Sequence, residues 1–452
     1  MNSEDALTEP FWLDYLPAFA QAKLKNRKNL HKAMANMGWL MFDRALRMLA
    51  GLFIGLWVAR YLGPGNFGVI NYAAAFVGIF AGVSALGLDS IVVREMLSRP
   101  HDRAAIMGTA FVLKLAASCV SFLISVTAIY FMKSDALVRV AVVILSATMI
   151  FQSLDVIRFW FESQVQSKYV VIVQNAAFLV LSAVKIVLLL QKASVIWFVW
   201  LMLLDVVLGA VGLAVYYHAL HGKINSWKFS VSEVPLLLRD SWPLMLSGIA
   251  IAIYMRIDQI MLGNMLGNSA VGTYSAAVRI SEVWYFIPIF ICRSIYPSLI
   301  EAKKQSEEKY LRRFQQLFRL MVYITLPIAI IVSFFARYVV LSLYGIQYLD
   351  AAKVLSVHIW TGVFVFWGVA GGYFYIIEGL SKILFYRSLY GVIVNILLNL
   401  FLIPLWGGVG AAISTLVAYS VQSYFSELFN PATRVIFKLK TKALFGLRSA
   451  VV

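Results

Sequence analysis

Apolar runs of about 20 residues, separated by short polar segments, make up most of the chain. A helix of that length crosses the hydrocarbon core of a bilayer, so each run predicts one membrane-spanning helix. The pattern predicts about twelve such helices, in two sets of six on either side of a polar break. The predicted spans are 39–61, 68–93, 106–131, 137–160, 169–190 and 194–218, then 241–263, 271–298, 317–340, 354–377, 384–405 and 408–429.

The unequal distribution of Lys and Arg between the loops predicts the orientation of the chain. Most basic residues fall in alternate loops and in the terminal segments, and the loop around Gly267 has none. Because basic loops stay on the cytoplasmic side, both termini are predicted to be cytoplasmic in a multi-pass protein of the inner (cytoplasmic) membrane. The predicted parts are a basic N-terminal segment 1–38, a six-helix bundle 39–220, a cytoplasmic linker 221–240, a second six-helix bundle 241–430 and a basic tail 431–452.

Composition supports the membrane assignment and excludes several other classes. Apolar residues make up 61% of the 452 residues and charged residues 13%, compared with about 25% in soluble domains. The two cysteines, Cys119 and Cys292, lie in apolar runs, which excludes a disulfide scaffold and a cysteine metal cluster. The net charge of +17 is spread over alternate loops, so it does not indicate nucleic-acid binding. No GxxxxGK[ST], GxSxG or HExxH motif is present, and neither an enzyme activity nor a resident cofactor or metal is predicted.

A short motif recurs at the first turn of each half. The segment RYLGPGNFGVINYAAAF at 60–76 matches NMLGNSAVGTYSAAVRI at 264–280 without a gap, and both contain LG-x4-G. With six helices per half, both turns fall on the same outer side of the membrane. The alternative is that the two hairpins acquired similar turn residues independently and are not repeats. Two parallel six-helix repeats are a transporter plan. The predicted fold is therefore an all-α polytopic membrane protein with two such repeats around a central cavity.

Cations inside the predicted spans come from both halves. An ionisable side chain within the bilayer is costly, so each is a candidate for function. Guanidinium forks suit phosphate oxygens, and a cationic cavity suits an anionic substrate. Arg44, Lys114 and Arg293 lie near predicted helix ends and could instead extend to the headgroups, which is the simpler account of Lys185. The predicted substrate-binding residues are Arg44, Arg47, Lys114, Arg256, Arg279 and Arg293.

Acidic residues in the spans are candidates for coupling transport to Na⁺ or H⁺. We predict this role for Asp205, Asp258 and Glu282. Asp258 could instead pair with Arg256. Further alternatives stay open: structural pairs of Asp155 with Arg158 and of Arg279 with Glu282, and titration of His358 near neutral pH.

Four stretches carry a resemblance to a known family. The run GLFIGLWVARYLGPGNFGVINYAAAFVGIFAGVSALGLDSIVVREM resembles the first helical hairpin of the Wzx-like polysaccharide flippases, the O-antigen and repeat-unit exporters of the multidrug/oligosaccharidyl-lipid/polysaccharide superfamily. DVIRFWFESQVQSKYV, YMRIDQIMLGNMLGNSAVGTYSAAVRISE and YFYIIEGLSKI support it. The resemblance covers residues 39–429.

The resemblance implies a substrate and a mechanism. Such proteins move undecaprenyl-pyrophosphate-linked oligosaccharides from the cytoplasmic to the outer leaflet by alternating access, between glycosyltransferases and a polymerase. The pyrophosphate would meet the cationic cavity while the lipid tail stays in the bilayer. A drug antiporter of the same superfamily would need a cavity dominated by carboxylates, and a lipid II flippase usually has two further helices. A sugar-polymerising membrane enzyme would need a large loop or an acidic motif outside the bilayer.

Overall fold

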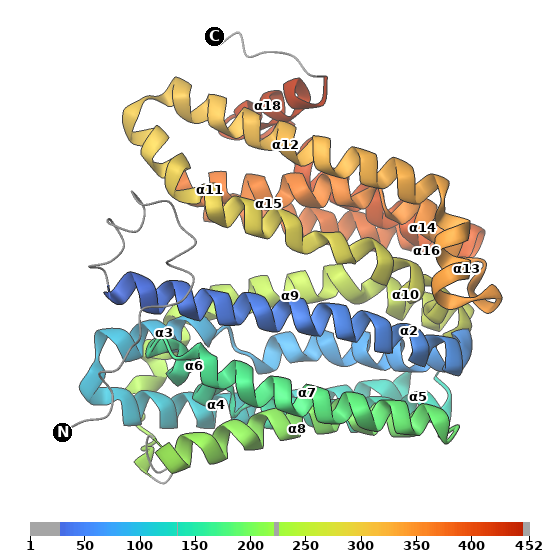
Figure 1. Ribbon diagram of the computed structural model, residues 1–452. Coiled ribbons are helices and arrows are strands. Elements are labelled where there is room, and N and C mark those ends of the chain that lie inside the picture. Colours follow the sequence, from blue (N-terminus) through green and yellow to red (C-terminus); the bar gives the residue numbers. More distant parts are fainter. Residues whose placement is uncertain (1–27, 133, 221–225, 446–452) are drawn as a thin grey trace, which may run out of the picture.

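Helices and short turns account for the whole described part of the chain, as predicted. This computed structural model describes residues 28–132, 134–220 and 226–445, and the side chains of 28–46, 48, 49, 52, 220 and 381 also lie outside its description. Figure 1 shows two groups of long helices, one from each half of the sequence. The all-α membrane fold predicted from the apolar runs is therefore confirmed.

The longest helices of the first half run along the length of the molecule, and shorter helices lie between them (Figure 1). Helix α2 reverses direction at Gly63, whose φ is 69°, so its legs at 28–62 and 64–84 are two separate crossings. The elements are α2 (Lys28–Ser84), α3 (Asp89–Ser98), η2 (Pro100–Asp102), α4 (Arg103–Phe131), α5 (Ala136–Gln152), α6 (Asp155–Ser163), α7 (Ser167–Leu190) and α8 (Val195–Leu220).

The second half repeats this plan and adds a terminal helix. Helix α16 reverses at Gly407, with a φ of 57°, and so forms legs at 381–406 and 408–420. The elements are α9 (Glu233–Leu266), α10 (Asn268–Glu282), η4 (Val283–Tyr285), α11 (Phe286–Gln305), α12 (Glu307–Phe334), α13 (Ala336–Tyr344), η5 (Ile346–Tyr348), α14 (Ala351–His358), α15 (Thr361–Ile377), α16 (Ser381–Ser420), η6 (a π-helix, Val421–Phe425), α17 (Ser426–Phe429) and α18 (Arg434–Leu444).

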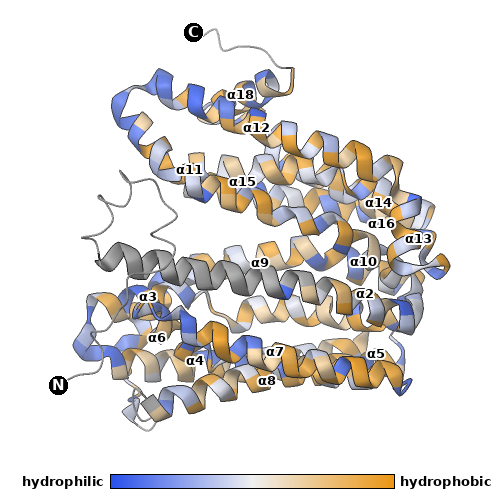
Figure 2. Cartoon of the chain, viewed as in Figure 1, coloured by the Kyte–Doolittle hydropathy of each residue, from blue (hydrophilic) through white to orange (hydrophobic). Residues whose placement is uncertain are grey.

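The number of membrane crossings agrees with the prediction. Ten helical stretches of the described residues are long and apolar enough to cross a membrane. Two of them, Phe53–Ser98 and Lys382–Phe429, contain the reversals at Gly63 and Gly407, which brings the described crossings to twelve. Figure 2 shows apolar residues along the middle of the helices and polar residues at the connections between them, most clearly between α11 and α12.

Hydropathy marks the apolar part of each helix and not its ends. The ninth span was predicted at 317–340, whereas α12 runs from Glu307 to Phe334. Ser306 caps its start by accepting a hydrogen bond from the backbone N–H of Lys309 at 3.1 Å, and the charged first turns follow this cap. Likewise α9 begins at Glu233, inside the segment predicted as the linker 221–240.

The repeated glycine turns meet each other in space. A Cβ atom on Gly68 would lie 1.7 Å from the backbone oxygen of Asn268, and one on Gly272 would lie 1.9 Å from that of Pro64. Pro64 and Asn268 occupy the same position in the two copies of the motif. The contact is therefore reciprocal, as expected for two parallel repeats related by an axis between the halves. Gly63 and Gly267 also share one backbone conformation, with φ, ψ of 69°, 171° and 84°, −179°.

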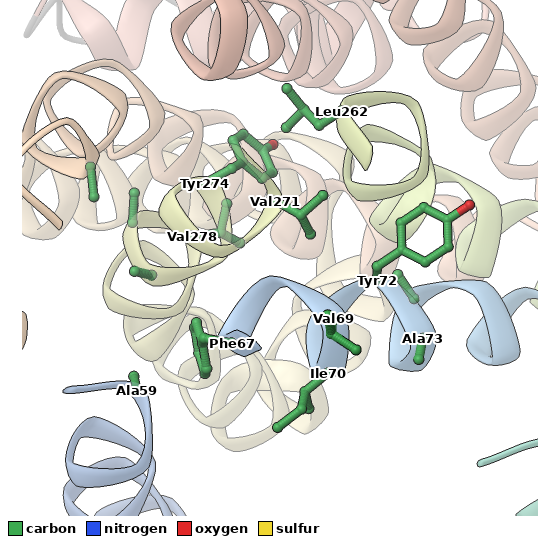
Figure 3. Close-up of a cluster of buried hydrophobic side chains, with 14 of the residues drawn as sticks. Ala59, Phe67, Val69, Ile70, Tyr72, Ala73, Leu262, Val271, Tyr274 and Val278 are labelled. Atoms are coloured by element: carbon green, nitrogen blue, oxygen red, sulfur yellow. The ribbon is translucent and has the colours of Figure 1, made fainter. Parts of the chain in front are cut away.

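An apolar core surrounds this contact (Figure 3). Because it draws on both halves, it joins them at the end that carries residues 63–68 and 267–272, which we call the turn end. The labelled core side chains come from α2, with Ala59, Phe67, Val69, Ile70, Tyr72 and Ala73, and from α9 and α10, with Leu262, Val271, Tyr274 and Val278.

Polar contacts tie the halves together at the turn end as well. The Tyr72 hydroxyl donates to Asn264 Oδ1 at 2.9 Å. Gln347 and Tyr348 of η5 donate to the backbone oxygens of Arg60 and Ala59 at 2.6 and 2.8 Å. These bonds add to the glycine contact and close the turn end between the halves.

At the opposite end, which we call the basic end, the first half holds the start of α9. The Arg99 guanidinium donates two hydrogen bonds to the Glu233 carboxylate, each of 2.8 Å, and Arg94 pairs with Asp240. The first turns of the second half are thus anchored on the first half.

Helix α18 lies within the predicted basic tail 431–452 and packs against α12 (Figure 1). The buried Lys440 amine donates to Glu427 Oε1 and to the Ser423 carbonyl, both at 2.6 Å. Burial lowers the pKa of Lys440 to about 8 while Glu427 opposes this change, so the amine stays protonated at pH 7. A buried ion pair therefore fixes the tail helix to the end of the second half.

Candidate functional site

Two arginines of the second half face the first half in the middle of the molecule. The Arg279 guanidinium lies against Gly55 of α2, where a Cβ would come within 2.7 Å of Nη1, and its Cζ is 6.0 Å from the centroid of the Phe67 ring. The side chain of Arg256 in α9 lies beside Gly78 in the second leg of α2. Both arginines are exposed although each faces protein of the other half. Both side chains therefore lie where the two halves meet.

Glu282 lies one turn after Arg279 and interacts electrostatically with both arginines. The pair of Glu282 with Arg279, considered from the sequence, is consistent with this arrangement. One carboxylate facing two guanidinium groups leaves an excess of positive charge. An excess of positive charge attracts anionic groups.

The other predicted cations whose side chains are described lie away from this pair. Arg293 is exposed on α11. It lies closer to the basic end than Arg279, by about 20 Å if each intervening residue rises 1.5 Å along a helix. Arg44 belongs to α2, but its side chain lies outside the described residues. Arg47 lies in the first half, with its Cζ 5.5 Å from the centroid of the Phe178 ring.

Lys114 is buried among acidic residues of the first half. Its amine lies 3.9 Å from Asp89 and 4.0 Å from Asp155, and 4.9 Å from the centroid of the Phe159 ring. Arg158 lies 3.8 Å from Asp155 and 3.9 Å from Asp89, so the pair suggested by the sequence is present within a larger cluster. These carboxylates offset the charges of Lys114 and Arg158.

Asp258 has a different environment, and its hydrogen-bond partners belong to the second half. It is buried in α9, and Oδ2 accepts hydrogen bonds from the hydroxyls of Tyr274 and Thr415 at 2.8 and 2.5 Å. Oδ1 accepts from Asn399 Nδ2 at 2.5 Å, and the same Nδ2 donates to Asn395 Oδ1 at 3.1 Å. The pairing of Asp258 with Arg256 is therefore not seen: its bonded partners here are neutral.

The polar groups around Asp258 are not fully satisfied. Asn399 Oδ1 and Asn395 Nδ2 are buried and lack a hydrogen-bond partner among the described atoms. Buried amide groups without partners are uncommon and call for a ligand or a water molecule. One carboxylate, two hydroxyls and two amides converge here, an oxygen-rich set of the kind that hard cations take.

His358 lies behind this cluster and is buried. Its Nδ1 is 2.9 Å from Ser281 Oγ, and its ring packs edge-on against Tyr274 with centroids 5.9 Å apart. It is thus a packing neighbour of the Asp258 cluster and is enclosed by the bundle.

Most partners of Asp258 were missed from the sequence, although one signal was available. Asn395 and Asn399 are spaced four residues apart within an apolar run, so they share a helix face. Thr415 and Tyr274, in contrast, carry no local sign of a common site, because they come from different helices.

Comparison with known proteins identifies the family. The model of the family described as polysaccharide biosynthesis protein matches residues 57–353. The chain belongs to this family. A candidate O-antigen transporter of Shigella flexneri is 24% identical over 337 residues, which cover 71% of this chain and 79% of that protein. The polysaccharide-flippase resemblance found in the sequence is confirmed.

Solved structures confirm the transporter fold. An inward-facing multidrug resistance MATE family transporter of the MOP superfamily superposes with a TM-score of 0.71 at 16% identity, over 88% of this chain and 96% of that chain. The lipid II flippase MurJ superposes with a TM-score of 0.66 at 14% identity, over 91% of each chain. The polysaccharide biosynthesis protein described here is thus a multi-pass membrane protein whose relatives and structural neighbours are transporters and flippases.

Proposed function

We propose that the protein is a flippase that moves undecaprenyl-pyrophosphate-linked oligosaccharides from the cytoplasmic to the outer leaflet. The observation that carries this proposal is the position of the exposed Arg256 and Arg279 where the two halves meet, in a family of polysaccharide biosynthesis. Guanidinium forks bind phosphate oxygens through paired hydrogen bonds. A pyrophosphate is the part of such a lipid that needs this stabilisation inside a membrane.

The proposed transport cycle alternates access from the two ends. The basic end faces the cytoplasm in this proposal, since loops rich in Lys and Arg remain there. The closed turn end then faces outward, and the substrate enters from the basic end with its lipid tail in the bilayer. Outward release requires the contact of Gly68 with Gly272 to open while the basic end closes.

A cation at Asp258 is the proposed coupling ion. Of the three acids considered from the sequence, Glu282 interacts with Arg256 and Arg279, and Asp205 interacts electrostatically with Lys185. Such cationic neighbours weaken the attraction for a further cation. Asp258 has hydroxyl and amide partners instead, which support Na⁺ as its ligand.

Replacing Asp258 by asparagine is expected to remove a sodium-dependent gain in stability. In 150 mM NaCl the wild-type protein should unfold at a higher temperature than in choline chloride, because a ligand bound only by the folded state stabilises it. Asp258→Asn keeps the shape of the side chain but lowers the charge of the site, so its melting temperature should be the same in both salts. Asp205→Asn is the control and should keep the sodium response. A wild-type protein indifferent to Na⁺, or a response lost only in Asp205→Asn, would contradict the assignment.

The proposed function is tested in cells that lack this gene. Deletion should remove the surface polysaccharide and cause lipid-linked oligosaccharide to accumulate on the inner leaflet, and the wild-type gene should reverse both effects. Sensitivity to cationic drugs with intact surface polysaccharide would instead support the antiporter alternative. Arrest of cell-wall synthesis would support the lipid II alternative.

A further inference from the structure

A half-open pocket with a volume of about 300 Å³ is lined by residues of the first half, and neither Arg256 nor Arg279 lines it. Its lining residues come from α2, from α5 to α8 and from the turn between α5 and α6, and the second half contributes none of them. This volume is at the lower end of the range for small-molecule sites, about 300–1,000 Å³, so the pocket suits one part of a larger ligand. The polar lining residues are Arg47, Gln152, Asp155, Arg158, Gln174 and Asp205.

The pocket has a balanced charge. Two guanidinium groups and two carboxylates line it together with two side-chain amides. A pyrophosphate would meet Asp155 and Asp205 there, whereas it meets an excess of positive charge at Arg256 and Arg279. A cationic ligand would meet Arg47 and Arg158. The lining therefore favours a neutral ligand.

The hydrogen-bonding groups of the pocket match a neutral ligand rich in hydroxyls. Carboxylates accept hydrogen bonds, guanidinium groups donate them, and the amides of Gln152 and Gln174 do both. A sugar hydroxyl also donates and accepts. Phe151 and Leu213 add apolar surface for the C–H face of a sugar ring. Gly209 leaves room beside them, because a Cβ at this position would meet no heavy atom within 4 Å.

The position of the pocket relative to the arginines fits a single ligand that reaches both sites. The Arg279 guanidinium lies against Gly55 in the first leg of α2. Arg47 lies on the same leg and lines the pocket. It is about 12 Å from Gly55 along the helix axis, at a rise of 1.5 Å per residue. A short oligosaccharide attached to a pyrophosphate can span this distance.

We propose that this pocket binds the first sugar units of the lipid-linked oligosaccharide through their hydroxyl groups. The proposal rests on the proposed function and divides the substrate between two sites. Arg256 and Arg279 bind the pyrophosphate, and the pocket of the first half binds the glycan and discriminates between glycans. Specificity for the glycan then depends on Gln152, Gln174 and Asp205, while affinity for the lipid carrier does not.

The test fills the pocket and compares two lipids that differ only in the glycan. The probes are undecaprenyl pyrophosphate and the lipid-linked oligosaccharide extracted from cells lacking this gene, each titrated onto the full-length protein in nanodiscs. Gly209→Leu places a side chain in the open space of the pocket and removes a helix glycine, so the fold should tolerate it. Gly372→Leu in α15, where a Cβ also meets no heavy atom within 4 Å, is the matched control.

Gly209→Leu should weaken binding of the lipid-linked oligosaccharide by about tenfold or more, which corresponds to a loss of a few hydrogen bonds. Binding of undecaprenyl pyrophosphate should stay within about twofold of the wild type, as it should for both lipids in Gly372→Leu. Gln174→Ala should show the same selective loss to a smaller degree, and Arg279→Ala should weaken both lipids.

Two results would overturn the proposal in distinguishable ways. Gly209→Leu and Gln174→Ala could bind the lipid-linked oligosaccharide as tightly as the wild type, or lose affinity equally for both lipids. Either result would show that the pocket does not bind the glycan, and would leave the proposed function intact. A wild-type protein that binds neither lipid would overturn the proposed function and this inference with it.

Discussion

Gly68→Ala is expected to abolish export of the glycan, although the substitution adds a single methyl group. The new Cβ would lie 1.7 Å from the backbone oxygen of Asn268, far inside van der Waals contact. Because the obstacle is backbone, no side-chain rotation relieves it, and the two halves must separate at the turn end. Gly272→Ala should have the same effect, since its Cβ would lie 1.9 Å from the Pro64 oxygen. Surface glycan in complemented deletion cells measures the loss.

Gly65→Ala is the matched control because it changes the same turn without a clash. A Cβ at this position meets no heavy atom within 4 Å, so export should stay near the wild-type level. Opening of the turn end can be measured separately in a variant without native cysteines that carries Gly78→Cys, next to Arg256. A membrane-impermeant thiol reagent added outside should label this cysteine faster in the Gly68→Ala background. Normal export by Gly68→Ala and Gly272→Ala at normal protein levels would show that the halves need not close here.

Arg279→Met is expected to lower export by about 30-fold or more while leaving the protein folded. Methionine keeps much of the volume beside Gly55 and Phe67 but removes the guanidinium fork, and loss of one partner in a buried charge-assisted contact costs about 2–5 kcal/mol. Arg256→Met should act in the same direction. Export rates in complemented deletion cells, normalised to membrane protein level, measure the effect.

Two further variants separate charge from shape at this position. Arg279→Lys keeps the charge without the fork and should restore part of the export. Arg337→Ala removes an exposed arginine of α13 outside the site and should have no effect. If Arg279→Met exported normally, the arginine would be a packing residue and the pyrophosphate would bind elsewhere.

The main features of the fold could be predicted from the sequence because lipid imposes a simple rule on it. An uninterrupted apolar run must become a helix that crosses the bilayer, and the Gly63 and Gly267 turns could be recognised from their motif. The ends of the helices were less predictable. The start of α12 depends on the Ser306 cap and on charged first turns, and a hydropathy pattern does not detect either of them.

The candidate site was only partly predictable, since charge is visible in a sequence and its neighbours are not. Arg256, Arg279 and Asp258 were identified because they are charged within apolar runs. That Lys114 faces Asp89 and Asp155 depends on the packing of α3, α4 and α6, which no local pattern encodes. The assignment of substrate-binding cations to both halves stays a prediction: the described contacts place Lys114 beside acidic residues, and Arg256 and Arg279 where the two halves meet.

Movement of a lipid-linked glycan across a membrane by this protein can be measured in liposomes. Purified protein is reconstituted with lipid-linked oligosaccharide whose glycan carries a fluorophore, and membrane-impermeant dithionite quenches the label that reaches the outside. The wild-type protein should increase the rate of quenching well above that of empty liposomes, and Arg279→Met and Gly68→Ala should not. A wild-type rate equal to that of empty liposomes, with folded protein and with Na⁺ supplied, would show that the protein does not move this lipid.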